Sequence, residues 1–160
     1  MDNNDKLDQS FLKLFKLLDM LRDCGAKHLG KKKLEFLVTL SYRQERSLFI
    51  VDNAAKEHPD GICQKDLARE LKTTMPATSV LVESMIKKNL FVRTRSERDR
   101  RSYCLHLTPF GQQTLELIKT NIHNLTSCVT EGISHSDLEC FCNSVDHISD
   151  RLEVFIRKRT

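Results

Sequence analysis

The stretch Gln64-Lys65-Asp66-Leu67-Ala68-Arg69-Glu70-Leu71 and the longer stretch from Thr74 to Asn89 together decide the fold of this 160-residue chain. In both stretches apolar side chains recur every three or four residues, which predicts two helices that each bury one face. Thr74 suits the N-cap of the second helix, Pro76 is tolerated in its first turn, and Asn89 tolerates the left-handed conformation that ends many helices. Two helices joined by a short turn predict a helix-turn-helix.

The spacing of apolar residues changes directly after these two helices. Leu90–Thr94 and Tyr103–Leu107 show the alternation that is typical of β-strands, and the segment between them carries four arginines. A charged β-hairpin directly after a helix-turn-helix is a wing. The sequence therefore predicts a winged helix-turn-helix domain over residues 41–108.

Amphipathic helices are expected on both sides of this domain. Residues 7–21, 115–129 and 138–155 each place apolar side chains along one helical face. Three such helices have more apolar surface than one small winged domain covers, and two of them carry a heptad-like stripe that favours a partner helix. We expect a mainly α protein with a small β-hairpin wing, in which residues 1–40 and 109–160 form a helical dimerisation region of a homodimer.

Short signals predict where these helices begin and end. Ser41–Gln44 and Ser136–Glu139 read as capping boxes, in which a serine and a glutamine or glutamate satisfy each other's backbone N–H groups. Thr108 with Pro109 predicts a third helix start. Gly25 is the expected end of the first helix, and Pro59 the expected limit of the helix that begins after Ser41.

Composition and charge narrow the class of protein. No apolar run approaches the roughly 18 residues that span a bilayer, and the acidic, polar start does not resemble a secretory signal, so we expect a cytoplasmic protein without a membrane partner. The net charge of +4 is unevenly distributed: residues 62–108 carry ten Lys or Arg against five Asp or Glu, and the rest of the chain sixteen against seventeen. A basic middle segment favours nucleic acid as a partner, although a solvated basic surface gives the same count.

The sequence offers little for catalysis or metal binding. It contains no nucleophile–base motif, no glycine-rich phosphate loop and no Cys-x-x-Cys pair, so we expect neither an enzyme nor a bound cofactor or metal. Cys140 and Cys142 are two residues apart, which places them on opposite sides of a helix, so we do not expect them to bind one metal ion together.

Several of these motifs together resemble the MarR family of bacterial transcription regulators. They are Ile62–Leu71, the helix through Met85, Asn89–Val92, the wing Asp99-Arg100-Arg101 and Leu107-Thr108-Pro109-Phe110-Gly111. The resemblance implies a homodimer that binds a pseudo-palindromic DNA operator, usually as a repressor. It also implies release by a small aromatic ligand or by thiol oxidation.

The candidate DNA-binding residues lie on the two helices and on the wing. Side chains from the first turns of a recognition helix reach base edges in the major groove, and arginines of a wing read the minor groove. By resemblance, Asp99 orients the guanidinium of Arg101. The family usually has Arg where Val80 stands, so the operator sequence stays open, and an architectural or protein-interaction module without an operator is the alternative. The full set is Lys65, Thr74, Pro76, Ala77, Ser79, Val80, Arg93, Arg95, Arg98, Asp99, Arg100 and Arg101.

Two kinds of effector site are candidates. Cys24 lies near the position where hydroperoxide-sensing relatives keep a reactive thiol, although a cysteine on an amphipathic helix is also a small buried hydrophobe. A small aromatic or anionic molecule is the other candidate effector. The segments that would line its crevice contribute Phe11, Phe15, His28, Tyr42 and Phe49, although the sequence favours core packing for all of these residues.

Overall fold

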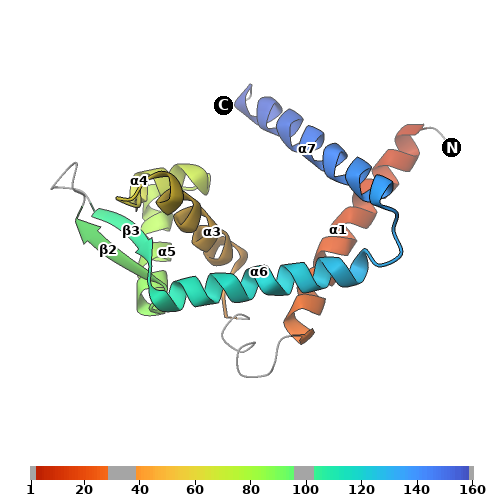
Figure 1. Cartoon of the computed structure of the whole chain (residues 1–160). Coiled ribbons are helices and arrows are strands. Elements are labelled where there is room, and N and C mark those ends of the chain that lie inside the picture. Colours follow the sequence, from red (N-terminus) through yellow and green to blue (C-terminus); the bar gives the residue numbers. More distant parts are fainter. Residues whose placement is uncertain (1–2, 29–38, 96–102, 159–160) are drawn as a thin grey trace. The chain divides into compact units, whose positions relative to one another are not determined.

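The computed structural model describes residues 3–28, 39–95 and 103–158, with the backbone alone at 3–4, 18–19 and 21–28 (Figure 1). Helices dominate, and a small three-stranded antiparallel sheet accompanies them, so the predicted fold class is confirmed. Packing divides the chain into two compact units, Met1–Ile122 and His123–Thr160. The elements in chain order are α1 (Asn3–His28), α3 (Tyr42–Glu57), β1 (Ile62–Cys63), α4 (Gln64–Glu70), α5 (Met75–Lys87), β2 (Phe91–Arg95), β3 (Tyr103–Leu107), α6 (Pro109–Val129) and α7 (His135–Arg157).

The core of the first unit joins the helix-turn-helix to the wing. Figure 1 shows α3, α4 and α5 gathered beside the sheet, whose strand order is β1-β3-β2. Leu48 of α3, Leu67 of α4, Met85 of α5 and Leu105 of β3 are all almost completely buried in one apolar cluster. Leu115 of α6 belongs to the same cluster, so the first half of α6 is anchored in the winged domain.

The predicted boundaries of α5 are confirmed. The Thr74 hydroxyl accepts from the Ala77 backbone N–H, and Pro76 lies in the first turn of α5. Asn89 has φ 56°, the left-handed conformation expected of it. Lys72, in the turn between α4 and α5, also has a positive φ of 50°, which the sequence did not predict.

The junction between β3 and α6 is held closely against the end of α5. The Thr108 hydroxyl donates to the Asn89 carbonyl at 2.5 Å and accepts from the Gly111 backbone N–H at 2.9 Å. A Cβ at Gly111 would collide with the Leu90 carbonyl, so only glycine allows α6 to approach this closely. The Thr-Pro-Phe-Gly sequence therefore fixes where α6 leaves the wing.

Two boundary predictions need correction, and one short strand was not predicted. α1 continues through Gly25 to His28, because a single glycine costs a long helix only about 1 kcal/mol. Ser134, not Ser136, is the N-cap of α7 and accepts from the Asp137 backbone N–H. β1 was missed because two residues are too short for an alternating pattern to be recognised. The capping box at Ser41 is confirmed, and α3 ends before the proline as expected.

The second unit contains α7, whose described side chains are all exposed or partly exposed. The stripe expected from the sequence leaves large apolar side chains in solvent at three- and four-residue intervals. Phe141, Val145, Ile148, Leu152 and Phe155 are each between 42% and 57% exposed. A helix with a long uncovered apolar face favours a partner helix.

Candidate nucleic-acid interface

The first two turns of α5 present an apolar surface to solvent. Pro76, Ala77 and Val80 are all exposed, and Val80 is 73% exposed. On the opposite side of the helix, Thr78 and Val82 are completely buried and hold α5 in the core. An exposed valine at this position has no packing role, and its methyl groups are available to contact the methyl group of thymine.

Ser79 is less available than its neighbours. Its hydroxyl accepts a hydrogen bond from Gln64 Nε2 at 2.6 Å and donates to the Met75 carbonyl at 3.0 Å. Gln64 is the first residue of α4, so this pair links the two helices of the helix-turn-helix. Gln64 was not predicted as a site residue, and nothing in the sequence marks it except its place at a helix start.

The wing is described only in its strands. Arg93 on β2 forms an ion pair of 2.7 Å with Glu83 on α5, so it links the wing to α5. Arg95, at the end of β2, is exposed. Arg98, Asp99, Arg100 and Arg101 lie outside the described residues, and their roles stay predictions.

The remaining predicted contacts lie on the helices. Lys65 is exposed on the first turn of α4, where its ammonium group is free to reach a phosphate. Thr74 is exposed as well, but its hydroxyl caps α5. The fold therefore gathers Lys65, Thr74, Pro76, Ala77 and Val80 on two consecutive helices.

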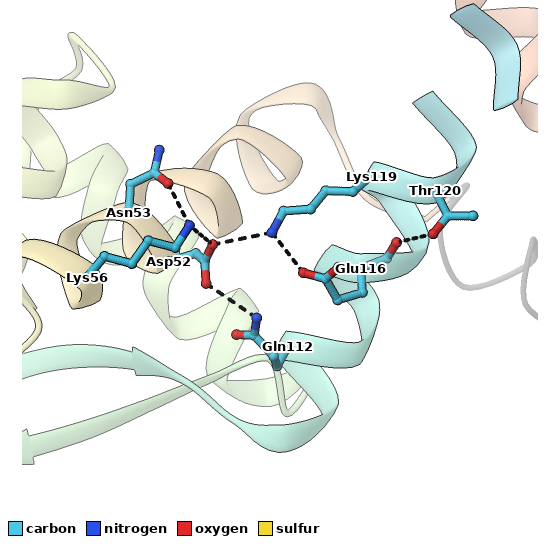
Figure 2. A network of polar contacts seen from close by, with 7 residues as sticks. All are labelled: Asp52, Asn53, Lys56, Gln112, Glu116, Lys119 and Thr120. Atoms are coloured by element: carbon cyan, nitrogen blue, oxygen red, sulfur yellow. Dashed lines mark hydrogen bonds and ion pairs between the residues drawn. The ribbon is translucent and has the colours of Figure 1, made fainter. Parts of the chain in front are cut away.

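A polar network behind this surface connects α6 to α3 (Figure 2). Asp52 of α3 is only 8% exposed, and its carboxylate lies 2.8 Å from Lys56 Nζ and 3.4 Å from Lys119 Nζ. Gln112 Nε2 also donates to this carboxylate at 3.3 Å. Burial by itself raises the pKa of Asp52, but the hydrogen bonds from Lys56 and Gln112 and the charge of Lys119 outweigh it, so the pKa is lowered.

Lys119 is shared between two carboxylates. Its ammonium group donates to Glu116 at 2.8 Å, one turn earlier on α6, as well as to Asp52. The hydrogen bond to Glu116 and the charge of Asp52 raise the pKa of Lys119. The network thus joins the helix that leads out of the winged domain to the helix that packs behind the helix-turn-helix.

The predicted effector residues are not brought together at a described cavity. Phe11 and Phe15 are exposed on α1, Tyr42 is exposed at the start of α3, and Phe49 packs against the core. The side chains of Cys24 and His28 lie outside the described part. A cavity of about 360 Å³ between α3 and α4 has a different lining, namely Ile50, Asn53, Ala54, Glu57, His58, Gly61, Ile62, Asp66, Arg69 and Glu70.

Among the described residues, no group of three or more His, Cys, Asp or Glu side chains is placed to hold a metal ion. None of the described helices is long and apolar enough to cross a membrane.

Comparisons with known proteins agree with the resemblance at the level of the fold. No protein-family model matches the chain. A protein of Thauera aromatica, described as a transcriptional regulatory protein for the hcr operon, is 39% identical over 59 residues, which are 37% of this chain and 36% of that protein. The chain therefore matches little more than a third of this relative's length.

Solved structures match over nearly the whole chain. Streptococcus pneumoniae FabT in complex with DNA superposes with a TM-score of 0.76 at 17% identity, covering 96% of this chain and 99% of that one. A marR-like transcriptional regulator of Thermotoga maritima gives a TM-score of 0.65 at 24% identity, covering 96% and 98%. The S. aureus MepR–DNA complex gives 0.65 at 20% identity, covering 88% and 97%. The chain has the fold of MarR-like regulators.

Proposed function

We propose that this chain is a DNA-binding transcriptional regulator of the MarR type that acts as a homodimeric repressor in the cytoplasm. The observation that carries the proposal is the exposed first half of α5, where Pro76, Ala77 and Val80 face solvent although the helix itself is anchored in the core. A recognition helix requires this combination of a fixed backbone and exposed side chains in its first turns. Two structures with the same fold contain DNA, which supports the assignment.

The recognition helix would read its operator mainly through apolar contacts. Ser79 already uses its hydroxyl within the protein, and Val80 has no polar group, so the helix offers few hydrogen bonds to base edges. Thymine methyl groups are the base feature that apolar side chains recognise in the major groove. We therefore expect sequence preference at thymines, with Lys65 and the wing arginines contributing contacts to phosphates and to the minor groove.

The second unit would provide the dimer contact. The exposed stripe from Phe141 to Phe155 has the spacing at which two helices pack side by side. Two winged domains in one dimer would read two half-sites about one DNA turn apart, or a multiple of it. The expected operator is therefore a pseudo-palindrome.

Selection of bound duplexes from a random library tests this function directly. The proposed regulator enriches a pseudo-palindromic motif whose half-sites contain thymines in the major groove. Enrichment of no motif, with binding that is equally tight to every duplex, would support the alternative of an architectural module.

The effector is tested in a separate binding experiment with the DNA upstream of this protein's own gene, because regulators of this kind often control their own expression. Binding is titrated with and without a hydroperoxide, and then with a set of small aromatic acids. Cys24 would be identified as the sensor by three results together: oxidation abolishes DNA binding, dithiothreitol restores the binding, and binding by Cys24→Ser is insensitive to oxidation. Release by an aromatic acid, abolished by Phe15→Ala, would identify the predicted effector pocket instead.

A further inference from the structure

Two cysteines of the winged domain lie directly opposite each other in the sheet. β1 pairs with β3 in antiparallel register, with Cys63 opposite Cys104 and Ile62 opposite Leu105. Side chains of directly opposed residues extend to the same face of a sheet, with their Cβ atoms about 4.5–5.5 Å apart. The fold thus brings together two thiols that are far apart in the sequence.

The hydrogen-bond pattern shows which kind of cross-strand pair they form. Continued by one residue, the β2–β3 register places Thr108 opposite Leu90. The Thr108 backbone N–H donates to the Leu90 carbonyl at 3.0 Å, so these two residues form a hydrogen-bonded pair. Hydrogen-bonded and non-hydrogen-bonded pairs alternate along antiparallel strands, so Thr94 and Cys104 also form a hydrogen-bonded pair. The backbone N–H and C=O groups of Cys104 therefore point toward β2. Toward β1, Cys104 therefore forms a non-hydrogen-bonded pair with Cys63.

This kind of pair has a spacing that suits a disulfide. Opposed Cα atoms of a non-hydrogen-bonded pair lie about 4.5 Å apart, the closer of the two antiparallel spacings. Disulfides span Cα separations of about 4.4–6.8 Å. Cys63 and Cys104 are both free thiols in this structure, so the described state is the reduced one.

The two thiols differ in access. Cys63 is partly exposed and donates to Asp66 Oδ2 at 2.9 Å, whereas Cys104 is only 6% exposed. Burial and the neighbouring Asp66 carboxylate raise the pKa of Cys63, so the thiol form predominates at neutral pH. A reagent from solution reaches Cys63 first, and Cys104 is placed to react in a second step.

We propose that Cys63 and Cys104 are a modification site that forms an intramolecular disulfide by exchange with a low-molecular-weight disulfide. Cys63 loses its proton to water and attacks one sulfur of the small disulfide, whose S–S bond breaks and releases one thiolate. Cys104 then loses its proton and attacks Cys63 Sγ, which releases the second thiolate. Both released thiolates take up a proton, so the two cysteines are oxidised by two electrons and the small disulfide is reduced to two thiols.

The disulfide would act at the start of the helix-turn-helix. Cys63 is the N-cap residue of α4, and no side-chain hydrogen bond caps that helix in the reduced state. On oxidation Asp66 loses the hydrogen bond from the Cys63 thiol but keeps its ion pair of 2.9 Å with Arg69. The start of α4 becomes covalently joined to the wing strand β3, independently of Cys24 and of the proposed function.

The test uses the full chain with Cys24, Cys128, Cys140 and Cys142 replaced by serine, so that only the proposed pair remains. The protein is incubated with glutathione disulfide, its free thiols are alkylated, and intact mass and peptide mapping are measured. We expect a product lighter than the reduced protein by two hydrogen atoms, with the Cys63 and Cys104 peptides linked. Alkylation of both residues, or a lasting glutathione adduct on Cys63 beside a free Cys104, would overturn the proposal.

Two single-cysteine variants of this protein give the order of the steps. In the variant with Cys104→Ser, glutathione remains attached to Cys63, because no second thiol displaces it. In the variant with Cys63→Ser, Cys104 stays unmodified because it is buried. Circular dichroism shows that each variant is folded, and equal labelling of the two cysteines in folded variants would contradict the assigned order.

Discussion

Lys119 Nζ of α6 lies 3.4 Å from Asp52 Oδ2 of α3, which joins the helix leading away from the wing to the helix packed behind the helix-turn-helix (Figure 2). Asp52 is nearly buried, and Lys56 and Gln112 also bind its carboxylate. The same carboxylate therefore holds two helices, of which α6 crosses from the first compact unit to the second.

Replacing Asp52 by asparagine should lower the free energy of unfolding by about 1 kcal/mol at neutral pH, since the lysine partners are partly exposed and screened. The pKa of Asp52 is lowered in the folded protein. A carboxyl whose pKa is lowered by folding stabilises the fold at pH values above its pKa in the unfolded chain. This stabilisation is lost as the pH falls through its pKa in the folded protein. In urea unfolding, wild type and Asp52→Asn should thus differ at pH 7 and begin to converge as the pH falls below about 4, the unfolded pKa of aspartate.

Glu116→Gln is the matched control for this experiment. It removes the other carboxylate bound to Lys119 and leaves the Asp52 pairs in place. Its effect on stability should be smaller, because Glu116 is exposed. A difference between wild type and Asp52→Asn that persists unchanged at pH 3 would mean that the charge of Asp52 is not what stabilises the fold.

Ile148→Glu should convert the proposed dimer to a monomer. Ile148 is 49% exposed in the middle of the apolar stripe of α7, and burying a carboxylate there against a second helix costs more than the apolar contact gains. Light scattering during gel filtration measures the mass. Asn143→Glu introduces the same charge on the opposite side of α7 and should remain dimeric; if both variants are dimers, α7 is not the dimer contact.

Val80→Ala should weaken operator binding about threefold to fifteenfold, the scale of burying one or two CH₂-sized groups, because the change removes both methyl groups of the valine. Replacing the contacted thymines by deoxyuridine removes the partner methyl group and should cost a similar factor. Both changes remove the same contact between Val80 and the thymine methyl group, so their combination should cost little more than either change alone. Val154→Ala truncates an exposed valine of α7 that lies off the apolar stripe, so it should leave affinity unchanged. Additive losses for Val80 and the thymines would refute the contact.

Arg101→Ala should reduce operator affinity tenfold or more and leave the dimer folded, since an arginine of the wing is expected to enter the minor groove. Arg101→Lys keeps the positive charge but lacks the planar guanidinium, so it should recover only part of the affinity. Fluorescence anisotropy gives the three affinities. Operator binding that is unchanged in Arg101→Ala would remove the wing from the proposed interface.

The sequence predicted structural features that depend on a few neighbouring residues. The Ser41 capping box, the Thr74 cap and the left-handed Asn89 were all predicted, because each depends on residues within one turn. The end of α1 was predicted wrongly because Gly25 weakens a helix without ending it.

The parts that the sequence did not predict are contacts between distant segments. The Gln64–Ser79 hydrogen bond and the pairing of Cys63 with Cys104 arise only when α4, α5 and the strands are packed together. The site residues themselves were named from the helix position and the resemblance. Their exposure on α5 agrees with that choice, while the contacts to DNA remain predictions.

The ratio of affinities for specific and nonspecific DNA tests the central proposal most directly. The wild-type protein is titrated by anisotropy against the duplex enriched by selection and against a scrambled duplex of the same composition, in the same salt. We expect a ratio of about 10³ or more in favour of the selected duplex. A ratio near one, with both affinities falling equally as salt is raised, would contradict sequence-specific binding. The protein would then bind DNA through contacts to phosphates only.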